Sequence, residues 1–230
     1  MDNSIFTDAQ LYERITYYSK MLTPERLERI NNVLAQRTRY LTVVLEDIFQ
    51  PHNASAVLRS CDGFGVQDVH IIENKNKFRL HKSVELGTSQ WLTINRYNNN
   101  NEHNTITAIE HLKQQGYRII ATSPHSGDVY LEELDIQAGK MALLFGTELT
   151  GLSNTALELS DEYMKIPMYG FVESFNISVS CAIVLHHLTH ALRNSGIALD
   201  LLDREQLELS YAWIRGNIKH SELHESHFLV

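Results

Sequence analysis

Five short runs of aliphatic and β-branched residues punctuate the chain, and the segments between them carry apolar residues at helical spacing. The runs are residues 40–46, 69–72, 117–121, 140–145 and 163–166. The first of them, Tyr-Leu-Thr-Val-Val-Leu-Glu, is too apolar to have a solvated face, which predicts a central strand covered on both sides. Strands that alternate with helices predict an α/β fold with a mostly parallel sheet and helices on both faces.

The helix signals at the two ends of the chain lie outside this alternation. Thr23 followed by Pro24 and Glu25 is typical of a helix start, with a capping hydroxyl, proline at the first helical position and an acid in the first turn. A C-terminal helix is expected to pack with the N-terminal ones. We therefore expect a helical extension over 1–39, an α/β domain over 40–196 and a second helical extension over 197–230. Helices are predicted over 8–20, 24–36, 51–61, 105–115, 176–194 and 203–216.

Polar, glycine-bearing turns follow several of the expected strands. They comprise residues 122–127, 146–151 and 167–174. Because the carboxyl ends of parallel strands meet at one edge of a sheet, these turns predict a ligand crevice there. The intervening residues 74–104 are expected to be irregular and polar, with a brief ordered return to the sheet at 87–94 and a surface loop at 98–101.

Composition narrows the class of protein without identifying it. The 230 residues carry a formal net charge of −8, with 43% hydrophobic and 21% charged residues, as in an ordinary globular protein. The negative net charge argues against nucleic-acid binding through the overall charge of the protein, so any contact with nucleic acid must be made by a local basic patch. With no apolar run long enough to span a bilayer and no signal peptide, we expect a cytoplasmic protein that binds no membrane.

Several common catalytic motifs are missing from the sequence. The first strand is not followed by GxGxxG, there is no P-loop lysine and there is no GxSxG nucleophile turn. Cys61 and Cys181 lack CxxC spacing, which favours a reduced setting and no metal motif. The histidines lack the HExxH pattern, so no metal site is predicted. They cluster in two groups, His186, His187 and His190, and His220, His224 and His227.

Three motifs remain, and each lies at a predicted strand end or helix start. They are Asn53-x5-Arg59, Gly146-Thr-Glu148-x2-Gly151, and Ile166-Pro-Met followed by Ser174-x-Asn176-x-Ser178. By itself the hydroxyl and amide cluster at 174–180 could be a simple helix cap. In order and spacing, however, the three motifs resemble those of the SpoU branch of the SPOUT RNA methyltransferases. The resemblance spans about residues 40–195.

The resemblance implies a fold, a cofactor and a set of site residues. It implies a deep trefoil knot in the C-terminal part of the sheet domain and S-adenosylmethionine bound in the knot crevice. Phe175 replaces the leucine that is usual in the family at that position. The reaction implied is methyl transfer to a ribose 2′-hydroxyl, without a metal. The expected cofactor contacts are Thr122, Gly146, Ile166 and Phe175, and the expected catalytic residues are Asn53, Arg59, Glu148, Ser174 and Asn176.

The family assigns activation of the hydroxyl to Arg59, which raises a chemical difficulty. A guanidinium keeps its proton up to a pKa above about 12 and is a poor base. An alternative is that Arg59 stays charged and grips the adjacent phosphate bidentately, while that phosphate or a water molecule accepts the proton. In either case Asn53 would orient Arg59 or the ribose, Glu148 would order the second motif, and Ser174 with Asn176 would shape the site.

The helical extensions resemble those of the TrmH-type enzymes of the family, which methylate a guanosine of the tRNA D loop (position 18). Relatives of this kind are homodimers through the knot, and the resemblance leaves open whether Arg59 acts in its own crevice or completes a neighbour's. Ribosomal RNA as the substrate, and a catalytically silent RNA-binding module, stay open as alternatives. The residues expected to bind tRNA are Arg14, Arg26, Arg29, Arg215 and Lys219.

Overall fold

A computed structural model describes residues 6–99, 103–123 and 129–228. The chain forms two compact units, one of residues 38–199 and one that joins residues 1–37 to residues 200–230. The larger unit is an α/β domain and the smaller one is helical. The expected division into a methyltransferase domain and two extensions stays a prediction about function.

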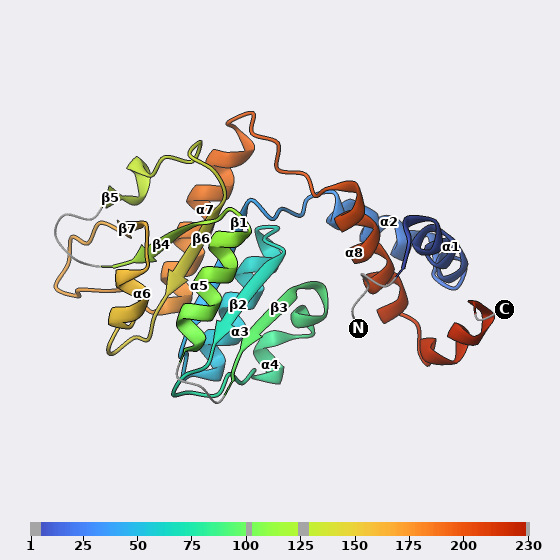
Figure 1. Ribbon diagram of the computed structural model, residues 1–230, viewed down its shortest axis with the longest axis horizontal. Helices are drawn as coiled ribbons and strands as arrows, with labels where there is room; N and C mark the ends of the chain where they lie inside the picture. The colour runs from blue at the N-terminus through green and yellow to red at the C-terminus, as the bar shows by residue number, and fades with distance from the viewer. Residues whose placement is uncertain (1–5, 100–102, 124–128, 229–230) are drawn as a thin grey trace. The chain divides into compact units, whose positions relative to one another are not determined.

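A seven-stranded sheet is the centre of the larger unit (Figure 1), and every described pairing in it is parallel. The strand order is β3-β2-β1-β6-β4-β7-β5. All six residues of β1 are buried, which confirms the predicted central strand. The strands are β1 (Leu41–Glu46), β2 (Asp68–Ile72), β3 (Thr93–Tyr97), β4 (Arg118–Thr122), β5 (Val129–Tyr130), β6 (Met141–Phe145) and β7 (Glu162–Lys165).

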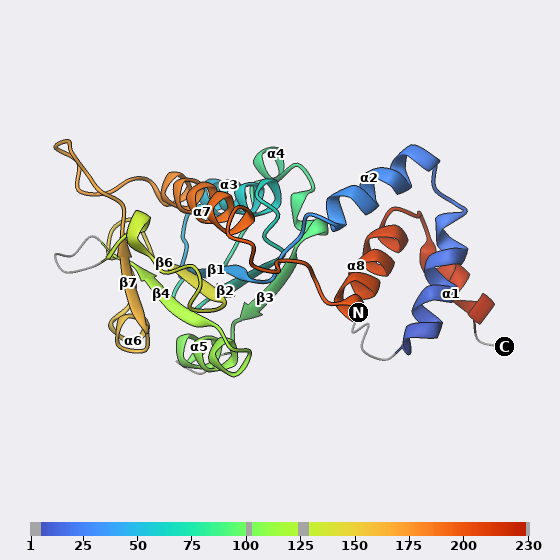
Figure 2. The same cartoon turned by 90° about the horizontal axis from the view of Figure 1, so that it is seen from above.

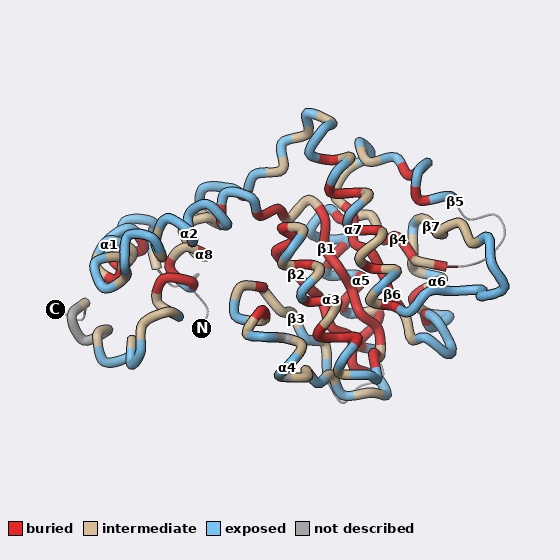
Figure 3. Tube along the Cα trace, turned by 180° about the vertical axis from the view of Figure 1, so that it is seen from behind, coloured by how far each residue is buried: buried red, intermediate tan, exposed pale blue. Residues whose placement is uncertain are grey.

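Helices cover both faces of this sheet (Figure 2). Helices α3 (Pro51–Gly63) and α7 (Ile177–Arg193) lie on one face, and α5 (Asn104–Gln114) and α6 (Asn154–Glu158) on the other. Because successive strand residues point to opposite faces, Val43 belongs to the core under α3 and α7, whereas Val44 belongs to the core under α5. The buried strands appear as the continuous red centre of Figure 3.

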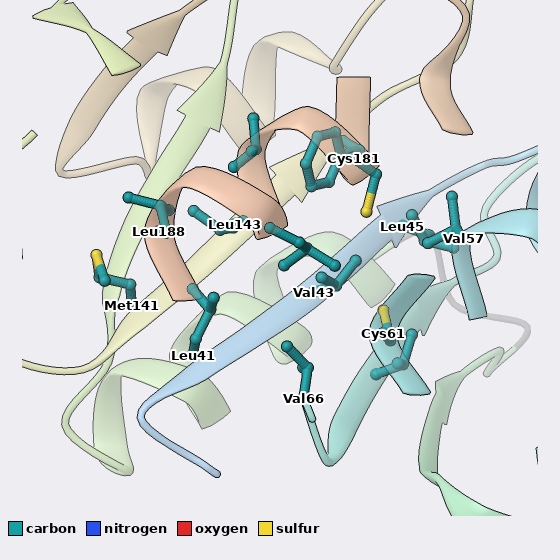
Figure 4. Packing of buried hydrophobic residues seen from close by; sticks show 14 of the residues in the cluster. Leu41, Val43, Leu45, Val57, Cys61, Val66, Met141, Leu143, Cys181 and Leu188 are labelled. Carbon is teal, nitrogen blue, oxygen red and sulfur yellow. The ribbon is translucent and has the colours of Figure 1, made fainter. Parts of the chain in front are cut away.

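The core under α3 and α7 is closely packed and apolar (Figure 4). Leu41, Val43 and Leu45 of β1 meet Val57 of α3 and Leu188 of α7, all with no exposed surface. Burial of a leucine or valine side chain stabilises a fold by about 1.5–3 kcal/mol. This packing fixes the positions of α3 and α7, whose first turns carry two of the three sequence motifs.

The edges of the sheet were harder to predict than its centre. Residues 82–97 contain more structure than expected, namely α4 (Lys82–Glu85), a 3-10 helix at Thr88–Trp91 and strand β3. Residues 88–91, expected to rejoin the sheet, form that 3-10 helix, and the pairing begins at Thr93. Strand β3 lies at the edge and is only partly buried, so its hydrophobic pattern is weak. Strand β5 was not predicted, and residues 100–101 of the expected loop and 124–127 of the first polar turn lie outside the described residues.

The helical unit consists of α1 (Asp8–Ser19), α2 (Pro24–Leu34), α8 (Asp203–Gly216) and a 3-10 segment at Ser221–Phe228. Thr23 caps α2 by accepting a hydrogen bond from the Arg26 backbone N–H, and Pro24 is the first helical residue, as predicted. Helix α8 packs against α1 and α2, which confirms the expected packing of the chain ends. In the described part of the chain, no helix is both long and apolar enough to cross a membrane.

Candidate active site

The three sequence motifs converge on one group of hydrogen-bonded side chains. Asn53 Nδ2 donates to Glu148 Oε1 at 2.7 Å, and Asn176 Nδ2 donates both to the same carboxylate and to Asn53 Oδ1, the latter at 3.1 Å. We call Asn53, Glu148 and Asn176 the motif junction. Their sequence separations of 95 and 28 residues show that only the fold brings them together.

Local sequence explains how each member of the junction is held. Asn53 lies in the first turn of α3, which begins at Pro51, and is 8% exposed. Asn176 is the N-cap of α7, and its Oδ1 accepts hydrogen bonds from the backbone N–H and the hydroxyl of Ser178. Asn176 therefore caps a helix and bonds across motifs at once, so capping is only part of its role.

Glu148 lies in the turn that follows β6, and close backbone packing shapes this turn. The backbone of Thr147 exchanges hydrogen bonds of 3.0 Å with that of Gly151. A Cβ at Gly146 would lie 2.2 Å from the carbonyl carbon of Gly151, so only glycine fits there. Gly151 itself has a φ of +67°, a conformation that favours glycine. The two glycines are thus required for the turn that presents Glu148.

A cavity of about 870 Å³ lies at the carboxyl ends of β4, β6 and β7. This is the edge at which the sequence predicted a crevice. Its wall includes all four residues expected to contact a cofactor, Thr122, Gly146, Ile166 and Phe175. Glu148 and Ser174 also line it, whereas Asn53 and Asn176 of the motif junction and Arg59 are absent from its described wall.

The lining of this cavity suits a partly apolar ligand with a positive charge. Apolar side chains, among them Leu152, Met164 and Ile166, form much of the wall. Of the described lining residues, Lys165 is the one with a basic side chain, against the two carboxylates of Glu148 and Glu173. The volume lies in the range of pockets that hold small ligands and cofactors. A purine nucleoside joined to a sulfonium fits this combination of apolar wall and negative charge.

Lys165 and Tyr130 are among the wall residues that sequence reasoning did not single out. Lys165 precedes Ile166, and its ammonium lies 4.7 Å from the centroid of the Tyr130 ring, a cation–π contact. Tyr130 belongs to the short strand β5, which the hydrophobic pattern of the sequence did not predict. A signal for Lys165 was available, since it is the basic residue next to the Ile166-Pro-Met motif.

Arg59 does not join the motif junction, although it shares helix α3 with Asn53. Six residues of α-helix correspond to about 600°, which places the two side chains on different sides of the helix. Arg59 is exposed and donates from Nη1 to the Val84 carbonyl at 3.3 Å. The sequence suggested that Asn53 orients either Arg59 or the ribose. In the structure Asn53 does not contact Arg59, so orientation of the ribose is the suggestion that stays open.

The residues expected to bind tRNA have different environments in the helical unit. Arg14 is 6% exposed, with its guanidinium 4.1 Å from the Phe6 ring centroid and 4.3 Å from that of Phe228. A guanidinium buried against two rings contributes to the packing of the helical unit, and the expectation that Arg14 binds tRNA stays a prediction. Arg26 bonds to Asn217 Oδ1 through Nε and Nη2, and Arg215 is half-buried. Arg29 and Lys219 are exposed.

Among the described residues, neither a cysteine nor a histidine lines the cavity. Cys61 and Cys181 are free thiols with no exposed surface. Hydrogen bonding to Cys61, together with burial, raises the pKa of the Cys181 thiol well above its usual range. Among the residues that the structure describes, no cluster of histidine, cysteine or acidic side chains could hold a metal ion.

The fold and the site define an α/β protein that binds a small ligand at the carboxyl edge of a parallel sheet. Residues 40–186 match the model of the SpoU rRNA Methylase family, and the chain belongs to this family. It is 47% identical over 219 residues to a tRNA (guanosine(18)-2′-O)-methyltransferase of Borreliella burgdorferi, covering 95% of this chain and 98% of the relative.

Two further comparisons agree with this assignment. A protein of the same name from Escherichia coli K12 is 36% identical over 179 residues, which are 77% of this chain and 75% of that protein. The crystal structure of the Aquifex aeolicus TrmH/SpoU tRNA modifying enzyme superposes with a TM-score of 0.74 at 28% identity. It covers 85% of this chain and 98% of the other.

Proposed function

We propose that this protein transfers a methyl group from S-adenosylmethionine to the ribose 2′-hydroxyl of guanosine 18 in tRNA. The observation that carries the proposal is the motif junction of Asn53, Glu148 and Asn176 beside a cavity lined by the expected cofactor residues. The specific substrate follows from the relatives named tRNA (guanosine(18)-2′-O)-methyltransferase, one of which matches nearly the whole chain.

The cofactor would be held by the loops after β4, β6 and β7. Thr122, Gly146, Ile166 and Phe175 would contact it, with Gly146 keeping the turn close enough for backbone groups to reach the ligand. When bound, S-adenosylmethionine supplies a methyl group on a sulfonium, which is an electrophile needing an aligned nucleophile. The residues of the chain therefore have to orient the ribose and remove one proton from its 2′-hydroxyl.

In this proposal the motif junction holds the loops of the site in position and takes no part in the chemical step. Both N–H groups of the Asn53 amide are used, one by Glu148 and one by Gln50 Oε1 at 3.2 Å. Both N–H groups of the Asn176 amide are used as well. The Glu148 carboxylate is thus an acceptor for two amides, which fixes the turn after β6 relative to the starts of α3 and α7. Ser174, exposed on the cavity wall, would shape the entry for the ribose.

Arg59 would act on the RNA as a cation. Its guanidinium would bind the phosphate next to the target ribose, and that phosphate or a water molecule would accept the hydroxyl proton. Arg59 does not line the cavity of its own chain among the described residues, so we infer that it completes the site of a second subunit. A homodimer built through a knotted C-terminal region accommodates this arrangement.

Exposed apolar side chains support a partner at this edge. Tyr169 and Phe171 are almost fully exposed, and Val172 is 62% exposed, on the loop that leads from β7 into α7. Large apolar side chains gathered on one exposed loop are typical of a contact surface. The loop also forms part of the cavity wall, so a second subunit placed there would reach the site.

The activity is tested by incubating the protein with labelled S-adenosylmethionine and, separately, total tRNA and ribosomal RNA. We expect label in the tRNA pool, located at the 2′-oxygen of guanosine 18 when the methylated nucleotide is mapped. Label confined to ribosomal RNA would move the substrate to that class. Absence of label from both pools, with the cofactor shown to bind, would favour an RNA-binding module without catalysis.

A further inference from the structure

A basic segment of the α/β unit lies outside the site described above. Residues 74–81, Asn-Lys-Asn-Lys-Phe-Arg-Leu-His, contain three basic side chains and no acid, within a chain whose net charge is −8. The segment follows β2, so it begins at the same carboxyl edge of the sheet as the turns that form the cavity. We call residues Lys75–His81 the basic strip.

The strip is held in a defined path by side chains of the underlying fold. Asp47 Oδ1 accepts the backbone N–H groups of Asn74, Lys75 and Asn76, at 2.7–3.2 Å. Farther along, the Phe78 N–H donates to Glu73 Oε2 at 2.8 Å and the His81 N–H donates to Ser55 Oγ at 2.8 Å.. Anchors at both ends of the strip fix its backbone, so its side chains are presented in a fixed order.

Within the strip, basic and apolar residues alternate. Phe78 and Leu80 turn inward and pack against the core beneath α3, whereas Lys77 and Arg79 are exposed, as is Lys75. The exposed cations therefore alternate with Asn76 and Phe78 along the segment, with Lys75 in the bend over Asp47 and Lys77 and Arg79 beyond it. A series of charges above an apolar anchor suits a ligand with repeated negative charges.

The three exposed cations of the strip have no neutralising partner among the described residues. Lys75, Lys77 and Arg79 make no side-chain hydrogen bond or ion pair with any residue that the structure describes. By comparison, Arg39 pairs with Asp68 at 3.0 Å and Arg96 pairs with Glu73 at 2.7 Å. Of the nearby carboxylates, Asp47 accepts backbone N–H groups and Glu73 is paired with Arg96, so neither cancels the charge of the strip.

The end of the strip lies against the face of α3 that carries Arg59. The ring of His81 stacks on that of His52 with centroids 3.8 Å apart, and Arg59 bonds to the carbonyl of Val84, three residues beyond the strip. His52 and Arg59 are seven residues apart, nearly two helical turns, and therefore share one side of α3. The strip thus leads to the residue proposed to hold the phosphate beside the target ribose.

We propose that residues Lys75–His81 form a docking strip for the phosphate backbone of the RNA substrate, continuous with Arg59. The inference rests on the proposed function and deepens it, because it names a contact surface within the α/β unit. The strip would hold the RNA through sequence-independent phosphate contacts, which position a substrate without reading its bases. It would supply the local basic patch that an acidic protein needs in order to bind RNA.

The test compares two charge-matched double variants of the full-length protein. Lys77→Gln with Arg79→Gln removes two charges from the strip. Lys113→Gln with Lys140→Gln removes two charges at the opposite edge of the sheet, where Lys113 pairs with Asp161 and Lys140 lies over the Tyr117 ring. Affinity for tRNA is measured over a range of salt concentrations. Thermal unfolding and binding of S-adenosylhomocysteine report on the fold and the cavity.

For the strip variant we expect affinity for tRNA to be about tenfold weaker at physiological salt. The plot of log K against log salt concentration should have a slope shallower by about 2, because each lost phosphate contact lowers the slope by about 1. The control variant should bind within about twofold of the wild type, and both should bind S-adenosylhomocysteine normally.

Three results bear on different claims. If the strip variant binds tRNA as the control does, the strip is not an RNA contact, and an acidic protein partner becomes the better occupant. If both variants weaken equally, net charge rather than the strip governs binding, which also overturns the inference. If the wild-type protein methylates tRNA and the strip variant binds tRNA with unchanged affinity, the proposed function is kept and the docking strip is rejected. A wild type that neither binds nor methylates tRNA refutes the function itself.

Discussion

Individual side chains in this protein have roles that residue type alone does not reveal. Arg14 and Arg29 are both arginines of the N-terminal helices, yet one is buried between two aromatic rings and the other is exposed. Likewise, Asn53 is a buried amide in a hydrogen-bonded junction, while Arg59 on the same helix is exposed. The decisive property at this scale is the surroundings of the side chain.

His70 shows the same principle in its protonation. It lies on β2 and is 2% exposed, and its Nδ1 is 3.0 Å from the hydroxyl of Tyr97. Burial, with a smaller contribution from the charge of His111, lowers the pKa of His70 to about 4. Burial, followed by the charge of Asp68, raises the pKa of Tyr97 to about 12. Both groups are therefore neutral at physiological pH.

This predicts a pH dependence of stability. Because the pKa of His70 is lower in the folded than in the unfolded protein, the unfolded chain binds the proton first as the pH falls below about 6.5. The free energy of unfolding should drop by about 1.4 kcal/mol per pH unit between roughly pH 6.5 and 4 from this group. Urea unfolding at several pH values should show a flatter profile for His70→Gln than for a His186→Gln control. Parallel profiles would contradict the assignment.

At the scale of elements, the turn after β6 links the sheet to the site. Its far end is held by Glu46 at the end of β1, whose Oε1 accepts the Ser153 hydroxyl at 2.8 Å and the Thr105 hydroxyl at 2.6 Å, while Oε2 accepts the Ser153 N–H. The near end is fixed by the close contact between Gly146 and Gly151. These two anchors therefore hold the Glu148 carboxylate for Asn53 and Asn176.

Gly146→Ala should break this element. The added methyl group would lie 2.2 Å from the backbone of Gly151, which a shift of a flexible side chain cannot relieve. We expect a loss of stability of about 1–3 kcal/mol and at least tenfold weaker binding of S-adenosylhomocysteine, because the displaced turn carries the cavity wall. Calorimetric binding and urea unfolding measure both quantities.

Gly170→Ala is the matched control for this substitution. Gly170 also lies in a loop that lines the cavity, but a Cβ there meets nothing within 4 Å. Stability within about 1 kcal/mol of the wild type is expected for the control. If Gly146→Ala bound the ligand as well as Gly170→Ala does, the close packing of the turn would not be needed for the cavity.

At the scale of the whole molecule, the acidic chain concentrates unpaired positive charge locally and is proposed to act as a homodimer. Arg59 is exposed and, among the described residues, does not line the cavity of its own chain. This position is why we propose that catalysis requires a dimer. Each subunit would contribute its cavity and motif junction to one site and its Arg59 to the other. The trefoil knot implied by the family resemblance stays a prediction.

Mixing two inactive variants tests this sharing. Arg59→Ala keeps Glu148, and Glu148→Ala keeps Arg59, so a mixed dimer would contain one intact site if Arg59 acts on the partner. After co-refolding at equal amounts, methylation of tRNA should recover to about a quarter of the wild-type rate, since about half of the dimers are mixed and each has one intact site.

A mixture of Arg59→Ala with the double variant Arg59→Ala/Glu148→Ala serves as the control and should stay inactive. Recovery no greater than in this control would show that Arg59 acts within its own subunit. Light scattering of the mixture would at the same time establish whether the protein is a dimer.

The amino-acid sequence by itself determined the elements of the sheet core, because strands buried on both faces leave continuous apolar runs such as residues 41–46. It also determined the family, since the three motifs keep their order and spacing along the chain. The edge strands β3 and β5 escaped prediction, because a partly exposed or two-residue strand carries too weak a hydrophobic pattern.

Only the tertiary structure decided which polar residues meet. Hydrogen bonds between Asn53, Glu148 and Asn176 join positions up to 123 residues apart, and no local pattern specifies such a contact. The same holds for Arg14, whose burial depends on Phe6 and Phe228 at opposite ends of the chain, and for the strip, whose lysines are exposed because Phe78 and Leu80 pack inward. Periodicity encodes which face of an element is buried, whereas side-chain partners and surface charge arise only when distant segments are packed together.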